Sequence, residues 1–138
     1  MSDRITYTLN GGVADVRFTR GERHNALDAQ QMQAVYETGA ELAARKDVRA
    51  VVLSGEGPSF CSGLDFPSFQ QPGQSLSSAF EVEDGQTANR AQRVATVWRD
   101  IPVPVIAALH GAAFGGGFQI AMGADLRIAT PQTRLCIM

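Results

Sequence analysis

The order of apolar and polar positions along the chain predicts two strands at its start, followed by a helix. Residues 5–9 and 13–19 carry apolar side chains at nearly alternate positions on either side of Asn10-Gly11-Gly12, which predicts a β-hairpin. Asp28 is a suitable N-cap for a helix that we expect to run to about Lys46. Apolar and small residues recur there at helical spacing: Met32, Val35, Tyr36, Gly39, Leu42 and Ala43.

The same reading continues through the second half of the chain. Short apolar runs at 50–54, 103–109 and 125–130 predict strands. Residues 66–85 are rich in Ser, Gln, Gly and Pro and predict a mobile loop. A helix is expected from Gln86 until the prolines that precede the next strand, with its apolar positions at Ala88, Ala91, Ala95 and Trp98. Alternating strands and helices favour an α/β fold with parallel strands.

A small-residue turn at 111–117 follows one of these strands and leads into an apolar stretch, 118–124, that suits a short helix. The first N–H groups of a helix lack intrahelical partners, and the helix dipole is positive there, so such a turn can bind an anion. A dinucleotide fingerprint would place its third glycine at Ile120, and no acidic residue follows Asp125. Two readings stay open: a hole for a transient oxyanion, which needs a second donor, and a tight helix–strand contact without a ligand.

A second glycine-containing turn supplies a candidate for that donor. The segment Gly55 to Phe66, which contains F-C-S-G-L-D, also follows a predicted strand. Together with H-N-A-L at 24–27, the stretch P-V-I-A-A-L-H-G-A-A-F-G-G-G-F-Q and the later A-D-L-R-I-A, it resembles the crotonase (enoyl-CoA hydratase/isomerase) family. The resemblance covers essentially the whole chain, and the order of the pieces makes it specific.

The resemblance carries expectations about architecture. It implies the crotonase/ClpP-like ββα spiral, with residues 1–138 as the N-terminal part of a single domain, truncated before the C-terminal helices through which the family usually trimerises. A full-length member is expected to be a homo-oligomer, a trimer or a hexamer. The loop at 66–85 is expected beside the acyl pocket. The chain ends in an apolar run, 135–138, that reads as a break inside a core element.

The resemblance also implies a site. The backbone N–H groups of Leu64 and Gly116 would hold the thioester oxygen of an acyl-CoA, which is the substrate, and no separate cofactor is expected. The family positions expected to contact the substrate are Arg23, His24, Ala26, Leu27, Ser62, Gly63, Asp65, Phe66, Ala112 and Gly115. Two of these have an alternative role. Arg23 could be a solvated surface charge rather than a contact to the CoA phosphates, and His24 is expected as a positioning or surface residue rather than a base.

The sequence differs from the family at the catalytic acids. Gln119 stands where hydratases have their first catalytic glutamate, and an amide cannot accept a proton as a general base at neutral pH. The second glutamate would lie beyond Met138. Among the catalytic functions of the family, isomerisation of an enoyl-CoA by a single acidic residue fits this sequence best. The alternatives are a non-catalytic acyl-CoA-binding homologue and a truncated fragment without activity of its own.

Composition and charge narrow the classes of function that the chain could have. A formal net charge of −2 gives no electrostatic footprint for nucleic acid or an anionic membrane, and no apolar run approaches a membrane span. The two cysteines, Cys61 and Cys136, do not form a metal motif, so no metal is expected, and a reducing compartment, the cytoplasm, is expected. Cys61 is expected as a small buried residue and His110 as a structural part of its turn. Asp125 and Arg127 are expected in structural ion pairs.

Overall fold

The computed structural model describes residues 3–73 and 75–138. Met1, Ser2 and Gln74, the last of which falls inside the expected loop, lie outside the described residues. The strands are β1 (Ile5–Asn10), β2 (Val13–Phe18), β3 (Ala50–Gly55), β4 (Val105–Leu109), β5 (Ala112–Phe114), β6 (Leu126–Ala129) and β7 (Arg134–Cys136). The helices are α1 (Ala29–Ala44), α2 (Phe66–Phe69), α3 (Arg90–Thr96) and α4 (Gly116–Gly123), with short 3-10 helices η1 (Gly21–Arg23), η2 (Leu76–Phe80) and η3 (Val97–Asp100).

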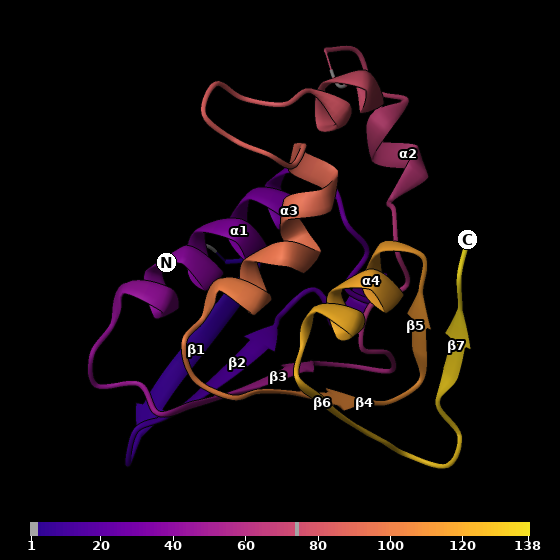
Figure 1. Ribbon diagram of the computed structural model, residues 1–138. Coiled ribbons are helices and arrows are strands. Elements are labelled where there is room, and N and C mark those ends of the chain that lie inside the picture. Colours follow the sequence, from indigo (N-terminus) through magenta and orange to yellow (C-terminus); the bar gives the residue numbers. More distant parts are fainter. Residues whose placement is uncertain (1–2, 74) are drawn as a thin grey trace.

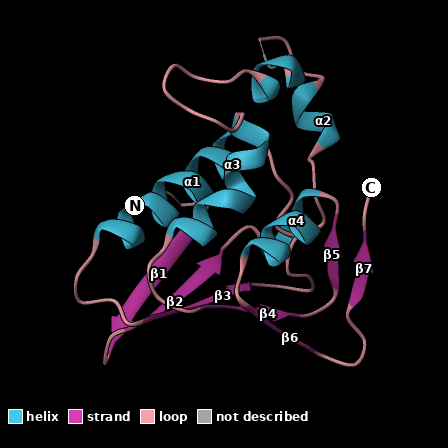
Figure 2. Ribbon diagram, in the orientation of Figure 1, coloured by secondary structure: helices cyan, strands magenta, loops and turns pink. Residues whose placement is uncertain are grey.

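Five strands form one sheet in the order β1-β2-β3-β4-β6. The expected hairpin pairs β1 with β2 in antiparallel fashion, and every later neighbour in the sheet is parallel. Figures 1 and 2 show α1, α3 and α4 on the same side of this sheet, while β5 and β7 stand apart from it near the C-terminus. The second sheet consists of β5 and β7, which pair in parallel.

The helices begin where local chemistry provides caps. The Asp28 side chain accepts a hydrogen bond from the Gln31 N–H, as expected for an N-cap, although α1 ends at Ala44, two residues short of the expected end. Asn89 and Gln92 form a reciprocal capping box, so α3 starts at Arg90 rather than near Gln86. The capping box therefore fixes a boundary that apolar spacing alone placed too early.

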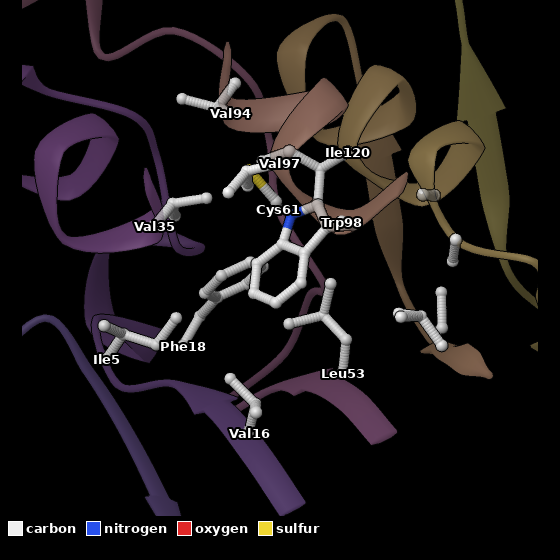
Figure 3. Packing of buried hydrophobic residues seen from close by; sticks show 14 of the residues in the cluster. Ile5, Val16, Phe18, Val35, Leu53, Cys61, Val94, Val97, Trp98 and Ile120 are labelled. Atoms are coloured by element: carbon white, nitrogen blue, oxygen red, sulfur yellow. The ribbon is translucent and has the colours of Figure 1, made fainter. Parts of the chain in front are cut away.

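The core lies between the helices and the covered face of the sheet. Trp98 is 1% exposed and lies beside Phe18, Val16 and Leu53, which come from β2 and β3 (Figure 3). Phe18 also meets Phe60 edge to face, with ring centroids 5.5 Å apart. The alternating burial of β2, β3 and β4 matches a sheet with one buried face. The position of the helices over this sheet thus follows from the pattern of apolar residues.

Two sequence-based expectations are wrong in detail. Residues 66–85 are not simply a loop, because they contain α2 and η2, and Ala79 is buried against the core. The glycine-rich turn at 111–117 contains the strand β5, which pairs with β7. The core supplies the burial of the first stretch, and β7 supplies the hydrogen bonds of the second. Neither contribution can be read from a short stretch of sequence.

Helices α3 and α4 approach closely at Gly123, the last residue of α4. A Cβ atom at this position would collide with the carbonyl oxygen of Ala95. Gly→Ala in a helix normally stabilises it by about 1 kcal/mol, but overpacking costs about 1–3 kcal/mol. We therefore expect Gly123→Ala to lower the free energy of unfolding, measured by urea denaturation. An unchanged or raised midpoint would show that the two helices can move apart freely.

Candidate functional site

The loop 61–65 is held by backbone hydrogen bonds on both of its flanks. On one side the Cys61 N–H donates to the Ala112 carbonyl at 3.0 Å, and the Phe114 N–H donates to the Cys61 carbonyl at 3.0 Å. On the other side the Leu27 N–H donates to the Gly63 carbonyl at 2.7 Å, and the Asp65 N–H donates to the Leu27 carbonyl at 3.0 Å. The loop thereby forms isolated parallel bridges with β5 and with Leu27.

This pattern leaves the N–H of Leu64 directed away from Leu27. In a parallel bridge the partner residue bonds to the two neighbours of the residue it faces, here Gly63 and Asp65. The N–H of Leu64 itself donates no hydrogen bond within the described part of the chain. It is an available donor on a fixed backbone.

The second donor stands at the start of α4. Gly116 is the first residue of this helix, so its N–H has no intrahelical acceptor. Gly115 before it has a φ of +49°, a conformation that favours glycine. A Cβ atom on Gly63 would lie 3.6 Å from the Gly116 nitrogen, which shows how closely the loop approaches the helix N-terminus. Because Leu64 directly follows Gly63, both expected donors lie in one place.

A largely apolar cavity of about 250 Å³ opens beside these two residues. Leu64, Gly116 and Gln119 all contribute to its wall, so the structure brings together the three residues expected at the centre of the site. The apolar wall comes from α1, α2, η2, α3 and the C-terminal residue. The full lining is Leu27, Met32, Leu64, Phe66, Leu76, Phe80, Ala91, Val94, Gly115, Gly116, Gln119 and Met138.

Gln119 lies one turn into α4 and is exposed. Its backbone N–H donates to the Gly115 carbonyl, which holds the first turn of the helix. Gln119 lines the cavity together with Leu64 and Gly116. The amide can donate to or accept from a ligand, but it cannot take up a proton at neutral pH.

The residues expected to contact the substrate divide between two hollows. Leu27, Phe66 and Gly115 line the cavity that contains the donors. His24, Ser62 and Ala112 line a separate hollow of about 380 Å³, together with Ser59, Gly111, Phe114 and Arg134. Ala26 and Gly63 are buried in the backbone framework between these surfaces.

Asp65 and Arg23 have a different environment from the one that direct substrate contact would require. The Asp65 side chain is 3% exposed, and its carboxylate pairs with Arg20 at 2.8 Å and with Arg23 at 3.5 Å. The Arg23 side chain remains 52% exposed, so one face of it is open to solvent. The Asp65 carboxylate is therefore occupied by two arginines and is not exposed for contact with a substrate.

Arg20 is a residue that the sequence did not single out. Its guanidinium donates to the Ala26 carbonyl at 2.9 Å and pairs with Asp28 at 3.2 Å as well as with Asp65. It thus joins the N-cap of α1, the 24–27 segment and the loop 61–65. The three partners are scattered along the chain and share no periodic spacing, so no sequence signal could have identified this network.

The two histidines serve the loops around the site. His24 has a φ of +52°, and its Nδ1 lies 2.9 Å from the Ser59 hydroxyl oxygen, while its side chain is exposed. The Nε2 of His110 lies 2.8 Å from the Gly57 carbonyl oxygen, in agreement with the structural role expected for it. Neither histidine lines the cavity next to Leu64 and Gly116.

Asp125 and Arg127 do not form the expected ion pairs within the described residues. The Asp125 carboxylate accepts a hydrogen bond from the Val105 N–H at 2.8 Å. Arg127 donates to the Ala124 carbonyl at 2.7 Å. Both side chains therefore satisfy backbone groups around the start of β6, because free N–H and C=O groups are the nearest partners at the ends of strands and helices.

Cys61 is completely buried, as expected, and burial raises the pKa of its thiol to about 12. The thiol therefore stays protonated near neutral pH and is a poor nucleophile, whereas Cys136 is exposed.

We expect a thiol reagent at pH 8 to modify one cysteine quickly in the folded chain, and Cys136→Ser to remove this fast phase. Denaturant should expose Cys61, and rapid labelling of both thiols in native buffer would contradict its burial.

Among residues 3–73 and 75–138, no group of His, Cys, Asp and Glu side chains has the arrangement of a metal site. Across the same ranges, no helix combines the length and the apolar character needed to cross a bilayer.

The sequence is similar to known proteins along most of its length. The sequence model described as Enoyl-CoA hydratase/isomerase matches residues 8–137. The (E)-benzylidenesuccinyl-CoA hydratase of Thauera aromatica is 33% identical over 94% of this chain and 48% of its own length. The 4-chlorobenzoyl coenzyme A dehalogenase-2 of an Arthrobacter species is 34% identical over 91% of this chain and 45% of its own length.

Solved structures show the same fold. A crystal structure of an enoyl-CoA hydratase/isomerase family member superposes with a TM-score of 0.81 at 31% identity, over 98% of this chain and 50% of the other. The enoyl-CoA hydratase of Bacillus anthracis, at 23% identity, has a TM-score of 0.82 over 96% of this chain and 49% of the other, which concerns the fold alone. The chain spans about half the length of the curated relatives it matches. With the expected crotonase fold confirmed, the chain belongs to the enoyl-CoA hydratase/isomerase family.

Proposed function

We propose that the chain carries the thioester site of an acyl-CoA enzyme of the hydratase/isomerase type. The thioester carbonyl oxygen would accept hydrogen bonds from the N–H groups of Leu64 and Gly116. The observation that carries this proposal is the juxtaposition of these two available donors at one end of an apolar cavity. An acyl chain suits such a cavity, since ligand sites are mostly apolar with a few polar groups that fix orientation.

The chemistry follows from where charge develops. Removing a proton next to the thioester carbonyl moves negative charge onto its oxygen, as an enolate. Two fixed donors strengthen their hydrogen bonds at that stage, which lowers the barrier more than it stabilises the bound substrate. The rigid attachment of the loop 61–65 and the start of α4 means that the donors need no rearrangement. The structure thus supports a step through an enolate.

The CoA portion would follow the segment 23–27 and the neighbouring loop. Arg23 has an exposed side chain that is suited to a phosphate group, and His24 and Ser62 share the second hollow. Leu27, which lines the first cavity, would contact the pantetheine, while the buried Ala26 and Gly63 would support this surface from behind. In this arrangement Asp65 supports the loop and does not touch the substrate.

The direct test is exchange of the acyl α-hydrogen in D₂O. Isothermal titration with butyryl-CoA would first establish binding, and mass spectrometry would then follow deuterium uptake at the α-carbon. Enzyme-dependent exchange is the expected result: a base from water or buffer removes the α-proton, the two donors stabilise the resulting enolate, and D₂O returns a deuteron to the α-carbon. Absence of binding would contradict the proposal.

Gln119 favours a second candidate, a non-catalytic acyl-CoA binder. It lies at the cavity wall but offers no carboxylate for proton transfer. Binding without α-hydrogen exchange would support this candidate over the enzyme. The variant Gln119→Glu is informative here: gain of exchange in the variant alone would show that the cavity and the donors are in place and that only a base is missing.

A further inference from the structure

A smaller cavity that is lined in part by two arginines lies beside the proposed acyl cavity. It has a volume of about 50 Å³, and its lining includes Tyr36, Ser78, Arg90 and Arg93. The volume exceeds the ~10–15 Å³ that one water needs by the same measure, so a small functional group can occupy it. Its wall is also mostly apolar, but it contains two arginines, which the described lining of the larger cavity lacks.

The buried arginine of this cavity has an unused donor. Arg93 is 8% exposed, and its guanidinium carbon lies 3.5 Å from the centre of the Tyr36 ring. One terminal nitrogen, Nη1, pairs with a Glu83 carboxylate oxygen at 2.6 Å. The Nε atom has no hydrogen-bond partner within the described residues, although it is buried. A buried donor without an acceptor is costly, which points to a ligand that supplies one.

The two cavities share their supporting elements. Met32 of α1 lines both of them. On α3, Ala91 and Val94 face the larger cavity, while Arg90 and Arg93 face the smaller one. Methionine is flexible and adapts to irregular space. An acyl group in the larger cavity therefore meets at Met32 a side chain whose movement would open a route to the arginine.

We propose that Arg93 recognises a carboxylate at the far end of the acyl group, so that the preferred substrates are CoA thioesters of dicarboxylic acids. This inference rests on the proposed function, because it assumes that the larger cavity holds an acyl chain. The Nε edge of a guanidinium binds a carboxylate with two parallel hydrogen bonds, and Arg93 has that edge free of Glu83. The aromatic ring of Tyr36 fixes the guanidinium plane, so the direction of recognition is set in advance.

The contacts of Glu83 show that a carboxylate can bind between Arg90 and Arg93. Its two oxygens bridge Arg90 at 2.8 Å and Arg93 at 2.6 Å, and these cations lower the pKa of the Glu83 carboxyl. Glu83 comes from the segment between η2 and α3, and its side chain is 43% exposed. Its negative charge also opposes the entry of a second carboxylate. Removing that charge should therefore strengthen binding of a dicarboxylic ligand and leave a neutral ligand unaffected.

The experiment compares paired ligands by isothermal titration calorimetry. One series runs from succinyl-CoA to suberyl-CoA, and each partner carries an isopropyl group in place of the terminal carboxylate. At the chain length that reaches Arg93, we expect the carboxylate to bind at least about tenfold more tightly, since hydrogen bonds between charged groups are the strong ones. Arg93→Met should remove this preference, while Arg99→Met, the same change at an exposed position on η3, should retain it.

Glu83→Gln gives a second readout that does not depend on the folding of the Arg93 variant. It should raise the affinity for the carboxylate ligand and leave that for its neutral partner unchanged. Equal affinities within every pair, or a preference that survives Arg93→Met, would overturn this inference while leaving acyl-CoA binding intact. Failure of both series to bind would overturn the proposed function together with this inference.

Discussion

Gly116→Pro is expected to reduce α-hydrogen exchange by about 10²–10³-fold, which corresponds to about 2.7–4 kcal/mol in barrier height for one lost oxyanion donor. Proline has no N–H, so the substitution deletes the backbone donor itself. Gly116 is the first residue of α4, the helical position that best tolerates proline. The variant therefore removes the donor with little expected damage to the helix.

Gly116→Ala is the matched control for this change. A Cβ atom at position 116 would lie 2.7 Å from Leu27 Cδ1, the end of a flexible side chain that must shift in either variant. Alanine keeps the N–H, so the ratio of the two rates isolates the hydrogen bond from the crowding. Equal rates for the two variants, measured with circular dichroism to confirm folding, would rule out Gly116 as an oxyanion donor.

Arg20→Met is expected to cost about 3–5 kcal/mol of folding free energy, the usual result of breaking a buried ion pair by removing one partner. Arg20 is 13% exposed and neutralises Asp65 and Asp28, whose side chains are 3% and 11% exposed. Methionine fills most of the volume but, among the described cations, leaves Asp28 with Arg4 alone at 3.0 Å and Asp65 with Arg23 alone at 3.5 Å, so the loss should fall toward the lower end of that range. The measurement is equilibrium unfolding in urea, followed by circular dichroism.

Arg23→Met provides the comparison for the network. Arg23 reaches the same Asp65 carboxylate at 3.5 Å, but its side chain is 52% exposed, so the change should cost about 0–1 kcal/mol. Its effect should appear instead in acyl-CoA affinity, if its exposed face meets a phosphate. Similar losses of stability in the two variants would mean that Asp65 does not depend on Arg20.

The main sheet could be predicted largely because its signals are local. The alternating apolar positions on either side of Gly11 and Gly12 lead to a hairpin, and Asp28 marks the start of α1. The strands β3, β4 and β6 correspond to short apolar runs in the sequence. By contrast, β5 lies in a stretch of small residues that predicts a turn, and its strand character depends on pairing with β7.

The motif resemblance predicts three residues that the structure places at one cavity, but it does not predict the rest of the cavity wall. The positions of Leu64, Gly116 and Gln119 follow from glycine-rich turns whose order along the chain is specific. Leu76 and Phe80 lie in a stretch that reads as polar loop, so their place in the cavity wall depends on how η2 folds back. Arg20 and Arg93 act through partners distant in sequence, which a linear pattern does not record.

The hydrogen bonds on both flanks of the loop 61–65 have a thermodynamic consequence for binding. Fixing a residue's backbone costs about 1–2 kcal/mol of conformational entropy. Here that cost is met when the chain folds, because β5 and Leu27 hold the loop without any ligand. A binding partner then meets a surface whose freedom has already been given up. More of its interaction energy remains available to distinguish one electronic state of the bound molecule from another.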